Sequence, residues 1–330
     1  MIISKTPLRV SFAGGGTDLP SFYKNNTYGA VLSTSINSYL YVCIKKQSPL
    51  FLEKYRLNYS ETELVDNINE IKNPIIRECL KFLEIDDPLY ISTVSDIPAS
   101  TGLGSSSTFS VGLLNALYKY KGESINAERL AEEAANIEIN LLNRPMGKQD
   151  HYAAAIGGLN YLRFNNDDSV NIKPINISKN LSEIFSSSVL MFWTGVTRPS
   201  ESVLKEQDEN NIINSDILIK IRDQAEDLSN LFLSENFSIK KIGKLVNEGW
   251  RLKKELASNI SNSDIDSYYN LAMENGAYGG KISGAGGGGF LNLISDPSKH
   301  NELINVLRKL GLLYYSFGLD SKGTQVKEIF

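Results

Sequence analysis

A loop rich in glycine and serine, PASTGLGSSS at residues 98–107, has the composition of a phosphate-binding site. Gly102 and Gly104 let the backbone approach a ligand and adopt positive φ. The serines from Ser105 to Ser107 follow at the predicted start of a helix, where free N–H groups and the helix dipole favour a polyphosphate. A serine hydroxyl there can also bind Mg²⁺. The plain alternative is a serine N-cap after a glycine turn, but three serines in a row favour the phosphate site.

This loop matches neither of the two common nucleotide-binding signatures. No lysine follows its glycines, as the pattern GxxxxGK[ST] requires, and its spacing differs from GxGxxG. The expected phosphate contacts are therefore Gly102, Leu103, Gly104, Ser105, Ser106, Ser107 and Thr108.

Two carboxylates lie twelve residues apart in the middle of the chain. Glu138 lies beside the apolar stripe of a helix predicted over residues 126–142, and Asp150 follows a bend at 144–147. Taken singly, Glu138 could be a solvated helix residue and Asp150 a helix N-cap. Phosphoryl transfer needs one acidic group on a metal ion and another at the acceptor hydroxyl. Together with the loop, the pair predicts such a site.

Two further glycine-rich segments carry groups that can bind a ligand. Around AGGGTD (13–18), Arg9 faces away from the apolar side of its predicted strand, and Asp18 can accept hydrogen bonds from hydroxyl groups. SGAGGGG (283–289) can bring backbone N–H groups close to an anion or a sugar. A run of glycines also forms ordinary tight turns, and that alternative stays open.

The elements that position these residues form an α+β pattern, without the regular βαβ alternation of a doubly wound sheet. The predicted strands cover 7–12, 29–46, 89–94 and the end of 281–294; the predicted helices cover 71–84, the segment from the loop to about Tyr120, 126–142 and most of 200–275. The Asn- and Asp-rich stretch at 165–180 predicts a domain junction. We therefore expect an N-terminal ATP-binding domain over residues 1–175 and a C-terminal domain over 176–330.

Composition excludes several functional classes. A chain of 330 residues with 42% hydrophobic residues can form two cores, and a formal net charge of -4 argues against nucleic-acid binding. Neither of the two cysteines has a CxxC or other metal-type partner, so with two histidines no Cys/His zinc site can be assembled. No apolar run approaches the roughly 20 residues of a membrane span, and the N-terminus lacks the apolar segment of a signal peptide. We expect a cytoplasmic protein with small-molecule partners.

The motifs and their order resemble those of the GHMP family of small-molecule kinases, which includes galactokinase, homoserine kinase, mevalonate kinase and phosphomevalonate kinase. The matching segments are PLRVSFAGGGTDLP (7–20), IPASTGLGSSSTFSVGLLNAL (97–117) and KISGAGGGGFLNL (281–293). The resemblance implies a two-domain fold. One domain would be like ribosomal protein S5 domain 2 and the other an α/β, ferredoxin-like GHMP domain, with the active site between them.

The same resemblance implies roles for single residues, with ATP and Mg²⁺ as cofactors. Ser106 and Glu138 correspond to metal ligands, and Asp150 to the aspartate that activates or orients the acceptor hydroxyl. Arg9 corresponds to the basic residue near the transferred phosphate, and Asp18 to an aspartate that contacts the sugar. The full set of expected substrate contacts is Gly15, Gly16, Thr17, Asp18, Lys148, Arg198, Gly284, Gly286 and Gly287.

One departure from the family pattern bears on the substrate. Galactokinase-type enzymes carry Gly-Glu-His-Thr-Asp where this chain has GGGTD (14–18), so galactose is a poor candidate. GGGTD, together with segments 144–164 and 192–200, resembles the D-glycero-D-manno-heptose 7-phosphate kinases. These phosphorylate the anomeric hydroxyl to the 1,7-bisphosphate, on a route to GDP-heptose for surface polysaccharide. A phosphate on the acceptor would then bind Arg198, Lys148 or the 284–288 amides. Arg198 could instead pair with Glu201.

Two other functions remain open from the sequence. One is a 1-kinase for an unphosphorylated sugar such as L-fucose, whose enzymes share part of the pattern. The other is a non-catalytic protein that binds ATP and sugar in order to sense them. Such a sensor would be expected to lack Ser106, Glu138 or Asp150, and all three are present.

Overall fold

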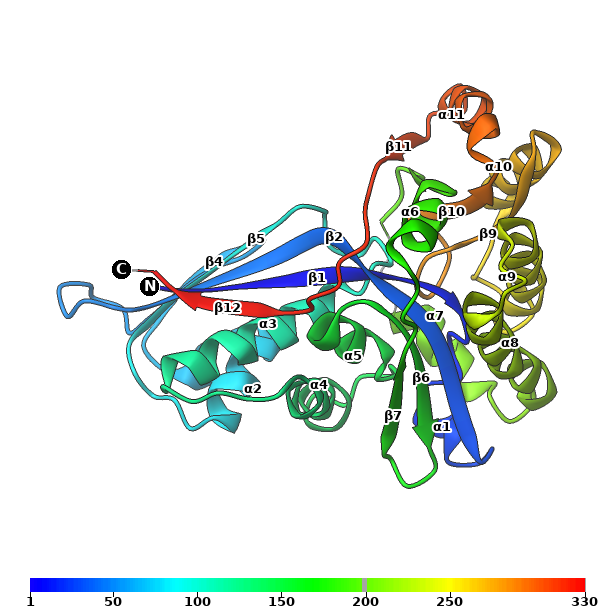
Figure 1. Cartoon of the computed structure of the whole chain (residues 1–330). Coiled ribbons are helices and arrows are strands. Elements are labelled where there is room, and N and C mark those ends of the chain that lie inside the picture. Colours follow the sequence, from blue (N-terminus) through cyan, green and yellow to red (C-terminus); the bar gives the residue numbers. More distant parts are fainter. Residues whose placement is uncertain (198–200, 330) are drawn as a thin grey trace.

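The computed structural model describes residues 1–197 and 201–329, which form two β-sheets with helices packed on them (Figure 1). Within these residues the larger sheet has eight strands in the order β12-β1-β2-β5-β3-β4, with β6 on β2 and β7 on β6. The strands are β1 (Ile2–Ala13), β2 (Tyr28–Lys46), β3 (Tyr55–Asn58), β4 (Thr62–Val65), β5 (Leu89–Ser95), β6 (Leu159–Asn165), β7 (Val170–Pro174) and β12 (Gln325–Glu328).

Strand β2 joins the two parts of this sheet because it is 19 residues long. Residues 28–34 pair with β6, and residues 40–46 pair with β5. Between Ser38 and Ile44 buried and partly exposed residues alternate, as they must in a strand with one covered face. The strands predicted over 7–12, 29–46 and 89–94 are confirmed, since they lie within β1, β2 and β5.

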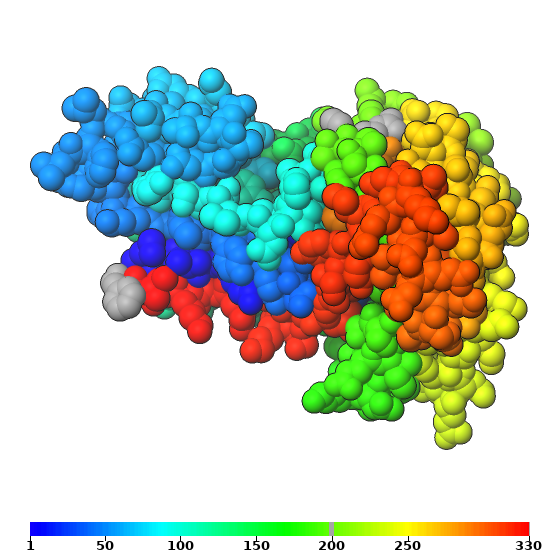
Figure 2. All heavy atoms as spheres, turned by 90° about the horizontal axis from the view of Figure 1, so that it is seen from above, coloured from blue at the N-terminus to red at the C-terminus, as the bar shows by residue number. Residues whose placement is uncertain are grey.

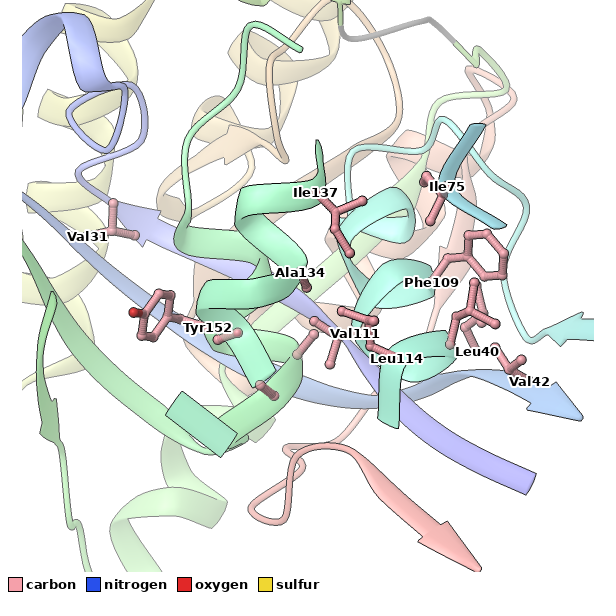
Figure 3. Close-up of a cluster of buried hydrophobic side chains, with 14 of the residues drawn as sticks. Val31, Leu40, Val42, Ile75, Phe109, Val111, Leu114, Ala134, Ile137 and Tyr152 are labelled. Atoms are coloured by element: carbon pink, nitrogen blue, oxygen red, sulfur yellow. The ribbon is translucent and has the colours of Figure 1, made fainter. Parts of the chain in front are cut away.

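Four helices cover one face of the larger sheet (Figure 1): α2 (Pro74–Phe82), α3 (Ser105–Tyr120), α4 (Ala127–Asn136) and α5 (Gln149–Ile156). Val111 and Leu114 of α3 are fully buried, and Figure 3 shows them in one cluster with Ala134, Ile137 and Leu40. Burying such a side chain stabilises the fold by roughly 1.5–3 kcal/mol. This packing holds the start of α3, and with it the loop at 98–104, against the sheet.

The smaller sheet has four antiparallel strands within the described residues, in the order β11-β8-β10-β9. They are β8 (Val189–Trp193), β9 (Ala277–Ile282), β10 (Phe290–Ser295) and β11 (Leu313–Tyr315). The accompanying helices are α6 (Lys179–Ser187), α7 (Glu201–Glu209), α8 (Ser215–Leu233), α9 (Ile239–Lys254), α10 (Ser263–Glu274) and α11 (His300–Arg308). The mainly helical character predicted for 200–275 is confirmed over the described part, 201–275. Short helical turns occur at α1 (Pro20–Tyr23), Ile68–Glu70 and Pro297–Lys299.

The C-terminal segment returns to the larger sheet, where β12 pairs with β1 and Ile2 faces Glu328. Figure 2 shows this segment, in red, running back along the blue N-terminal residues. The domain boundary at residue 175 stays a prediction: the chain leaves the larger sheet after β7, but residues 325–328 lie on that sheet again. None of the helices in the described residues is both long enough and apolar enough to span a bilayer.

Candidate active site

A cavity of about 780 Å³ is lined by residues from both halves of the chain. Its walls come from β1 and the glycine turn after it, the loop before α3, the start of α5, helices α7 and α9, and the glycine loop between β9 and β10. The residues that line it include Arg9, Gly15, Gly16, Asp18, Gly102, Gly104, Ser105, Ser106, Ser107, Gln149, Asp150, Gln207, Lys253, Gly284 and Gly286. The phosphate loop, the segment that carries Asp150 and the two other glycine-rich segments therefore all line this cavity.

The loop before α3 has the conformation that its glycines allow. Gly102 and Gly104 have φ of 83° and 79°, and Gly104 is the N-cap of α3. A Cβ at Gly102 would lie 2.5 Å from the carbonyl oxygen of Ser283, so the loop also packs closely against the third motif. The hydroxyl groups of Ser105 and Ser107 are buried and have no hydrogen-bond partner among the described residues. Amides and hydroxyls at the start of α3 are thus available to an anion.

Leu103 and Thr108 have structural positions in this loop. Leu103 is fully buried, and its carbonyl oxygen accepts a hydrogen bond from the backbone N–H of Arg9 at 3.1 Å. The hydroxyl of Thr108 donates to the carbonyl oxygen of Pro7 at 3.3 Å. The backbone carbonyl of Leu103 and the side chain of Thr108 thus tie the loop to β1, and both residues are fully buried.

Arg9 and Asp150 form a bidentate ion pair beside the loop. Arg9 Nε donates to Asp150 Oδ1 at 2.6 Å and Nη2 to Oδ2 at 2.5 Å, while Nη1 donates to the carbonyl oxygen of Gly102 at 2.6 Å. A Cβ at Gly104 would lie 3.2 Å from Asp150 Oδ2. A carboxylate and a guanidinium therefore stand directly beside the N-terminus of α3, where planar pairing of this kind is strong and directional.

Glu138 is fully buried and lies on a π-helical turn, Ile137–Leu141, that follows α4. Single π turns occur frequently at functional sites. Oε1 accepts a hydrogen bond from Ser110 Oγ at 2.8 Å and lies 3.0 Å from His151 Nε2. Oε2 accepts hydrogen bonds from Ser106 Oγ and Arg144 Nη1, both at 2.5 Å. Helix α4 was predicted to continue to residue 142, but the regular helix ends at Asn136.

The pKa of the Glu138 carboxyl is set by opposing effects. Burial alone would raise this pKa, whereas the hydrogen bond and charge of His151, the hydrogen bond from Ser106 and the charge of Arg144 lower it. The lowering effects dominate and bring the pKa of Glu138 to about 2. Glu138 is therefore a fixed anion at neutral pH.

Asp18 lies deep in the cavity wall and is 3% exposed. It accepts hydrogen bonds from the N–H of Gly16 at 3.2 Å and from Gln149 Nε2 at 2.9 Å. Burial, and then the charge of Asp150, raise the pKa of Asp18. The neighbouring Thr17 is fully buried and its hydroxyl bonds to the carbonyl oxygens of Gly14 and Ala30, so Thr17 shapes the turn and does not line the cavity.

Comparison with known proteins identifies the family. The sequence model described as "GHMP kinases N terminal domain" matches residues 68–158, and the one described as "GHMP kinases C terminal" matches residues 231–312. The chain is 30% identical to a D-glycero-alpha-D-manno-heptose 7-phosphate kinase from Campylobacter jejuni, and the match covers 98% of each chain. This chain belongs to the GHMP kinases.

Other known proteins also match this GHMP kinase over nearly its whole length. Galactokinase from Pyrococcus furiosus is 25% identical, over 96% of this chain and 95% of that protein. A solved structure titled D-glycero-D-manno-heptose 1-phosphate kinase, from Bacteroides thetaiotaomicron, aligns with a TM-score of 0.80 at 24% identity and covers 100% of both chains. A putative sugar kinase from Campylobacter jejuni aligns with a TM-score of 0.75 at 27% identity, over 99% and 98% of the two chains. The predicted two-domain α+β GHMP fold is confirmed, and the chain is an ATP-dependent phosphotransferase with a hydroxyl acceptor.

The site fits the ATP and divalent metal that GHMP kinases use. The unpartnered Ser105 and Ser107 hydroxyls and the amides of the loop suit a polyphosphate. Ser106 Oγ and Glu138 Oε2 are two hard oxygen atoms that could bind a metal ion. Arg144 Nη1 donates hydrogen bonds to both, so a positively charged group contacts both oxygen atoms in this structure. The described residues contain no cluster of three or more His, Cys, Asp or Glu that would hold a metal. Mg²⁺ at nucleotide sites often takes only one or two protein ligands besides water and phosphate oxygens.

The remaining predicted substrate contacts differ in position. Gly284 and Gly286 line the cavity, whereas the N–H of Gly287 donates to the carbonyl oxygen of Ile260 at 2.8 Å. Lys148 lines a second cavity of about 780 Å³, where its ammonium group pairs with Glu132 at 2.5 Å. Its side chain is thus separate from the group formed by Asp18 and Asp150. Arg198 lies outside the described residues.

Sequence reasoning missed Lys253 and Gln207 in the cavity wall and His151 and Ser110 behind Glu138. Lys253 had a detectable signal: it follows Val246 by seven residues and Trp250 by three, so it continues the buried stripe of α9. Gln207 follows the buried Val203 by four residues, but one apolar residue in a short charged helix does not define a buried stripe. His151 directly follows Asp150 in the sequence, but its contact with Glu138 depends on how α5 packs against the π turn.

Gly147 provides a test of the position of Asp18. A Cβ at Gly147 would lie 2.0 Å from Asp18 Oδ2, so Gly147→Ala must displace that carboxylate. We expect the KM for the sugar acceptor to rise about tenfold or more, because misplacement by about 1 Å can cost up to ~100-fold, and the KM for ATP to stay within about twofold. Gly122→Ala is the control: φ of 76° strains the backbone there, but nothing lies within 4 Å of the new Cβ, so neither KM should change. An unchanged acceptor KM in Gly147→Ala would show that Asp18 does not contact the acceptor.

Proposed function

We propose that this GHMP kinase transfers the γ-phosphoryl group of ATP to the anomeric C1 hydroxyl of D-glycero-D-manno-heptose 7-phosphate, giving the 1,7-bisphosphate. The observation that carries this proposal is the shared cavity, which the Asp150–Arg9 pair lines together with the phosphate loop and the Gly15–Gly16 turn. The likeness to the Campylobacter jejuni heptose 7-phosphate kinase, over nearly the full length of both chains, supports this choice of sugar.

The residues around the cavity have separate roles in this proposal. The amides of residues 102–108 bind the ATP phosphates. Ser106 and Glu138 hold Mg²⁺, which when bound neutralises charge on the phosphate oxygens. Asp18 accepts hydrogen bonds from sugar hydroxyls, and Arg9 stabilises charge on the γ-phosphoryl oxygens.

Transfer is direct, with no covalent intermediate on the protein. The C1 oxygen forms a bond to the γ-phosphorus while the bond from that phosphorus to the β–γ bridging oxygen breaks, and ADP leaves with the electron pair. The proton of the C1 hydroxyl passes to the carboxylate of Asp150 and then to solvent. An anomeric hydroxyl is more acidic than an ordinary alcohol, so the main task of Asp150 is to orient it.

Arg144 competes with the metal ion in this arrangement, because its guanidinium donates to both proposed ligands. We therefore expect Arg144→Met to bind a divalent ion more tightly in the absence of nucleotide, by about tenfold, since a charged hydrogen bond is worth roughly 1.5–3 kcal/mol. Titration with Mn²⁺ followed by electron paramagnetic resonance measures this affinity. Arg129→Met, which removes an exposed pair with Glu133, is the control. Equal or weaker Mn²⁺ binding in Arg144→Met would exclude Ser106 and Glu138 as the metal site.

A substrate panel tests the proposed acceptor. ADP release is measured with heptose 7-phosphate, mannose 6-phosphate, L-fucose and galactose at equal concentrations. We expect kcat/KM for heptose 7-phosphate to exceed the others by at least about 100-fold, which corresponds to roughly 3 kcal/mol of transition-state binding. A higher value for L-fucose would replace the proposal by a fucose-type 1-kinase.

A further inference from the structure

Lys253 is a buried cation without an acidic partner. It lies near the C-terminus of α9, is 6% exposed and lines the cavity. Its ammonium group donates to the carbonyl oxygen of Gly284 at 2.5 Å, and within the described part of the chain Lys253 forms no ion pair. Burial, and then the charge of Arg9, lower the pKa of Lys253 to about 8, although the charges of Asp18 and Asp150 act in the opposite direction.

Burying the ammonium group of Lys253 in this way is energetically unfavourable unless an anion binds beside it. A buried ammonium group with one carbonyl partner loses most of its hydration and regains a single hydrogen bond. The dipole at the C-terminal end of α9 offsets only a small part of that loss. Because Lys253 faces the ligand cavity, a bound anion can supply the missing partner.

The space in front of Lys253 is left open by two glycines. A Cβ at Gly15 would lie 3.7 Å from Lys253 Nζ and 3.9 Å from Gln149 Nε2. A Cβ at Gly16 would lie 3.5 Å from both Gln207 Nε2 and the apolar Leu218 Cδ2. Three N–H donor groups therefore surround a turn that has no side chains of its own.

Gln207 is a second sign that a ligand binds here. Its side chain is 3% exposed and lines the same cavity, and Nε2 is buried without a hydrogen-bond partner among the described residues. A buried donor without a partner destabilises the fold unless a ligand accepts its hydrogen bond. Gln149, by contrast, already donates to Asp18, so its amide also fixes the adjoining carboxylate.

These donors are separate from those expected to hold ATP. The nucleotide phosphates are expected on the amides that begin α3, whereas Gln149, Gln207 and Lys253 come from α5, α7 and α9. They surround the turn beside Asp18, on the acceptor side of the cavity. We propose that a phosphate group already carried by the sugar acceptor binds over Gly15 and Gly16, held by the ammonium group of Lys253 and the amide of Gln207. This inference rests on the proposed function, and it assigns a binding site to the acceptor phosphate.

Binding without turnover tests the site. Isothermal titration of the full chain, without nucleotide, measures the affinity for heptose 7-phosphate and for the same heptose without phosphate. We expect Lys253→Met to weaken binding of heptose 7-phosphate about 30-fold or more and to change binding of the unphosphorylated heptose less than twofold. Lys244→Met removes an exposed lysine from the same helix and should change neither affinity.

Gly15→Glu is a second test that leaves Lys253 in place. Gly15 does not have positive φ, and its Cβ would make only ordinary contacts, so the backbone accepts the change. The new carboxylate would reach Lys253 and occupy the site. We expect about 30-fold weaker binding of heptose 7-phosphate, with the affinity for a non-hydrolysable ATP analogue within twofold of the wild type.

The outcomes separate this inference from the proposed function. Lys253→Met could weaken binding of the phosphorylated and unphosphorylated sugars equally, or weaken binding of the ATP analogue instead. Either result would exclude the site for the acceptor phosphate and show that Lys253 binds another ligand. If the wild type binds mannose 6-phosphate more tightly and Lys253→Met selectively weakens binding of that sugar, the phosphate site is supported and the proposed heptose substrate is wrong. If no phosphorylated sugar binds better than its unphosphorylated form, both are wrong.

Discussion

Replacing Asp150 by asparagine should lower kcat about 1000-fold and leave the affinity for ATP within about twofold. Asp150 is the carboxylate that stands beside the phosphate loop, paired with Arg9, at the point where the acceptor hydroxyl must meet the γ-phosphate. Asparagine keeps the shape but loses the charge that pairs with Arg9 and orients the acceptor hydroxyl, and it cannot accept the hydroxyl proton. Positioned acid–base groups contribute typically 10²–10⁴-fold. The loop amides that bind ATP are unchanged, so single-turnover kinetics and nucleotide titration should separate the two effects.

The control for this prediction is Asp87→Asn, which removes the charge of a partly exposed carboxylate that pairs with Lys46. It should leave both kcat and ATP affinity unchanged. If Asp150→Asn retained more than about a tenth of the wild-type kcat, Asp150 would have no place in the transfer step and the acceptor would have to be oriented by other residues.

Glu138→Gln should produce the second large effect, because it removes the charge from the most buried carboxylate of the site. Oε2 of Glu138 lies beside Ser106 at the proposed metal position. We expect kcat to fall about 100- to 1000-fold at ordinary Mg²⁺ concentration, equivalent to roughly 3–4 kcal/mol. Raising the Mg²⁺ concentration should recover part of the loss. A variant with unchanged Mg²⁺ dependence would show that Glu138 acts only in the structure.

The same substitution should alter the stability of the protein with a defined pH dependence. The pKa of Glu138 is lowered to about 2 in the folded protein, from an ordinary value near 4.5. Because the folded protein binds this proton more weakly than the unfolded chain, the ionised Glu138 stabilises the folded state at pH values above about 4.5. This stabilisation is about 3 kcal/mol, and it is lost as the pH falls from about 4.5 to 2. Denaturant unfolding should therefore show a gap between wild type and Glu138→Gln at pH 6 that narrows below pH 4. A constant gap would contradict the lowered pKa.

The sequence predicted those features that local rules determine. Strands β1, β2 and β5 follow from alternating apolar residues, and the start of α3 at Ser105 follows from the glycines and serines before it. The order of the motifs also indicated the family. The structure brings Ser106 and Glu138 together, the two residues that the family resemblance implies as metal ligands. It also pairs Arg9 with Asp150, which the sequence did not predict. Their catalytic roles stay predictions.

Other parts of the site depend on packing that no local pattern encodes. The π turn at Glu138 and the contact of Arg144 with that residue arise where α4 and α5 meet. Lys148 was expected at the substrate, but a partner on α4, Glu132, holds its ammonium group at the other cavity. Gln207 reaches the cavity only because α7 of the C-terminal half lies over the glycine turn of the N-terminal half. Contacts between segments so distant in sequence require the fold itself.

The most direct test of the proposed reaction is ³¹P nuclear magnetic resonance of the purified protein with MgATP and heptose 7-phosphate. The function proposed above predicts that the ATP signals are replaced by those of ADP and by one new phosphate signal coupled to the anomeric proton, while the original sugar phosphate signal remains. A new phosphate on another carbon, or consumption of ATP with release of free phosphate alone, would contradict transfer to the anomeric hydroxyl.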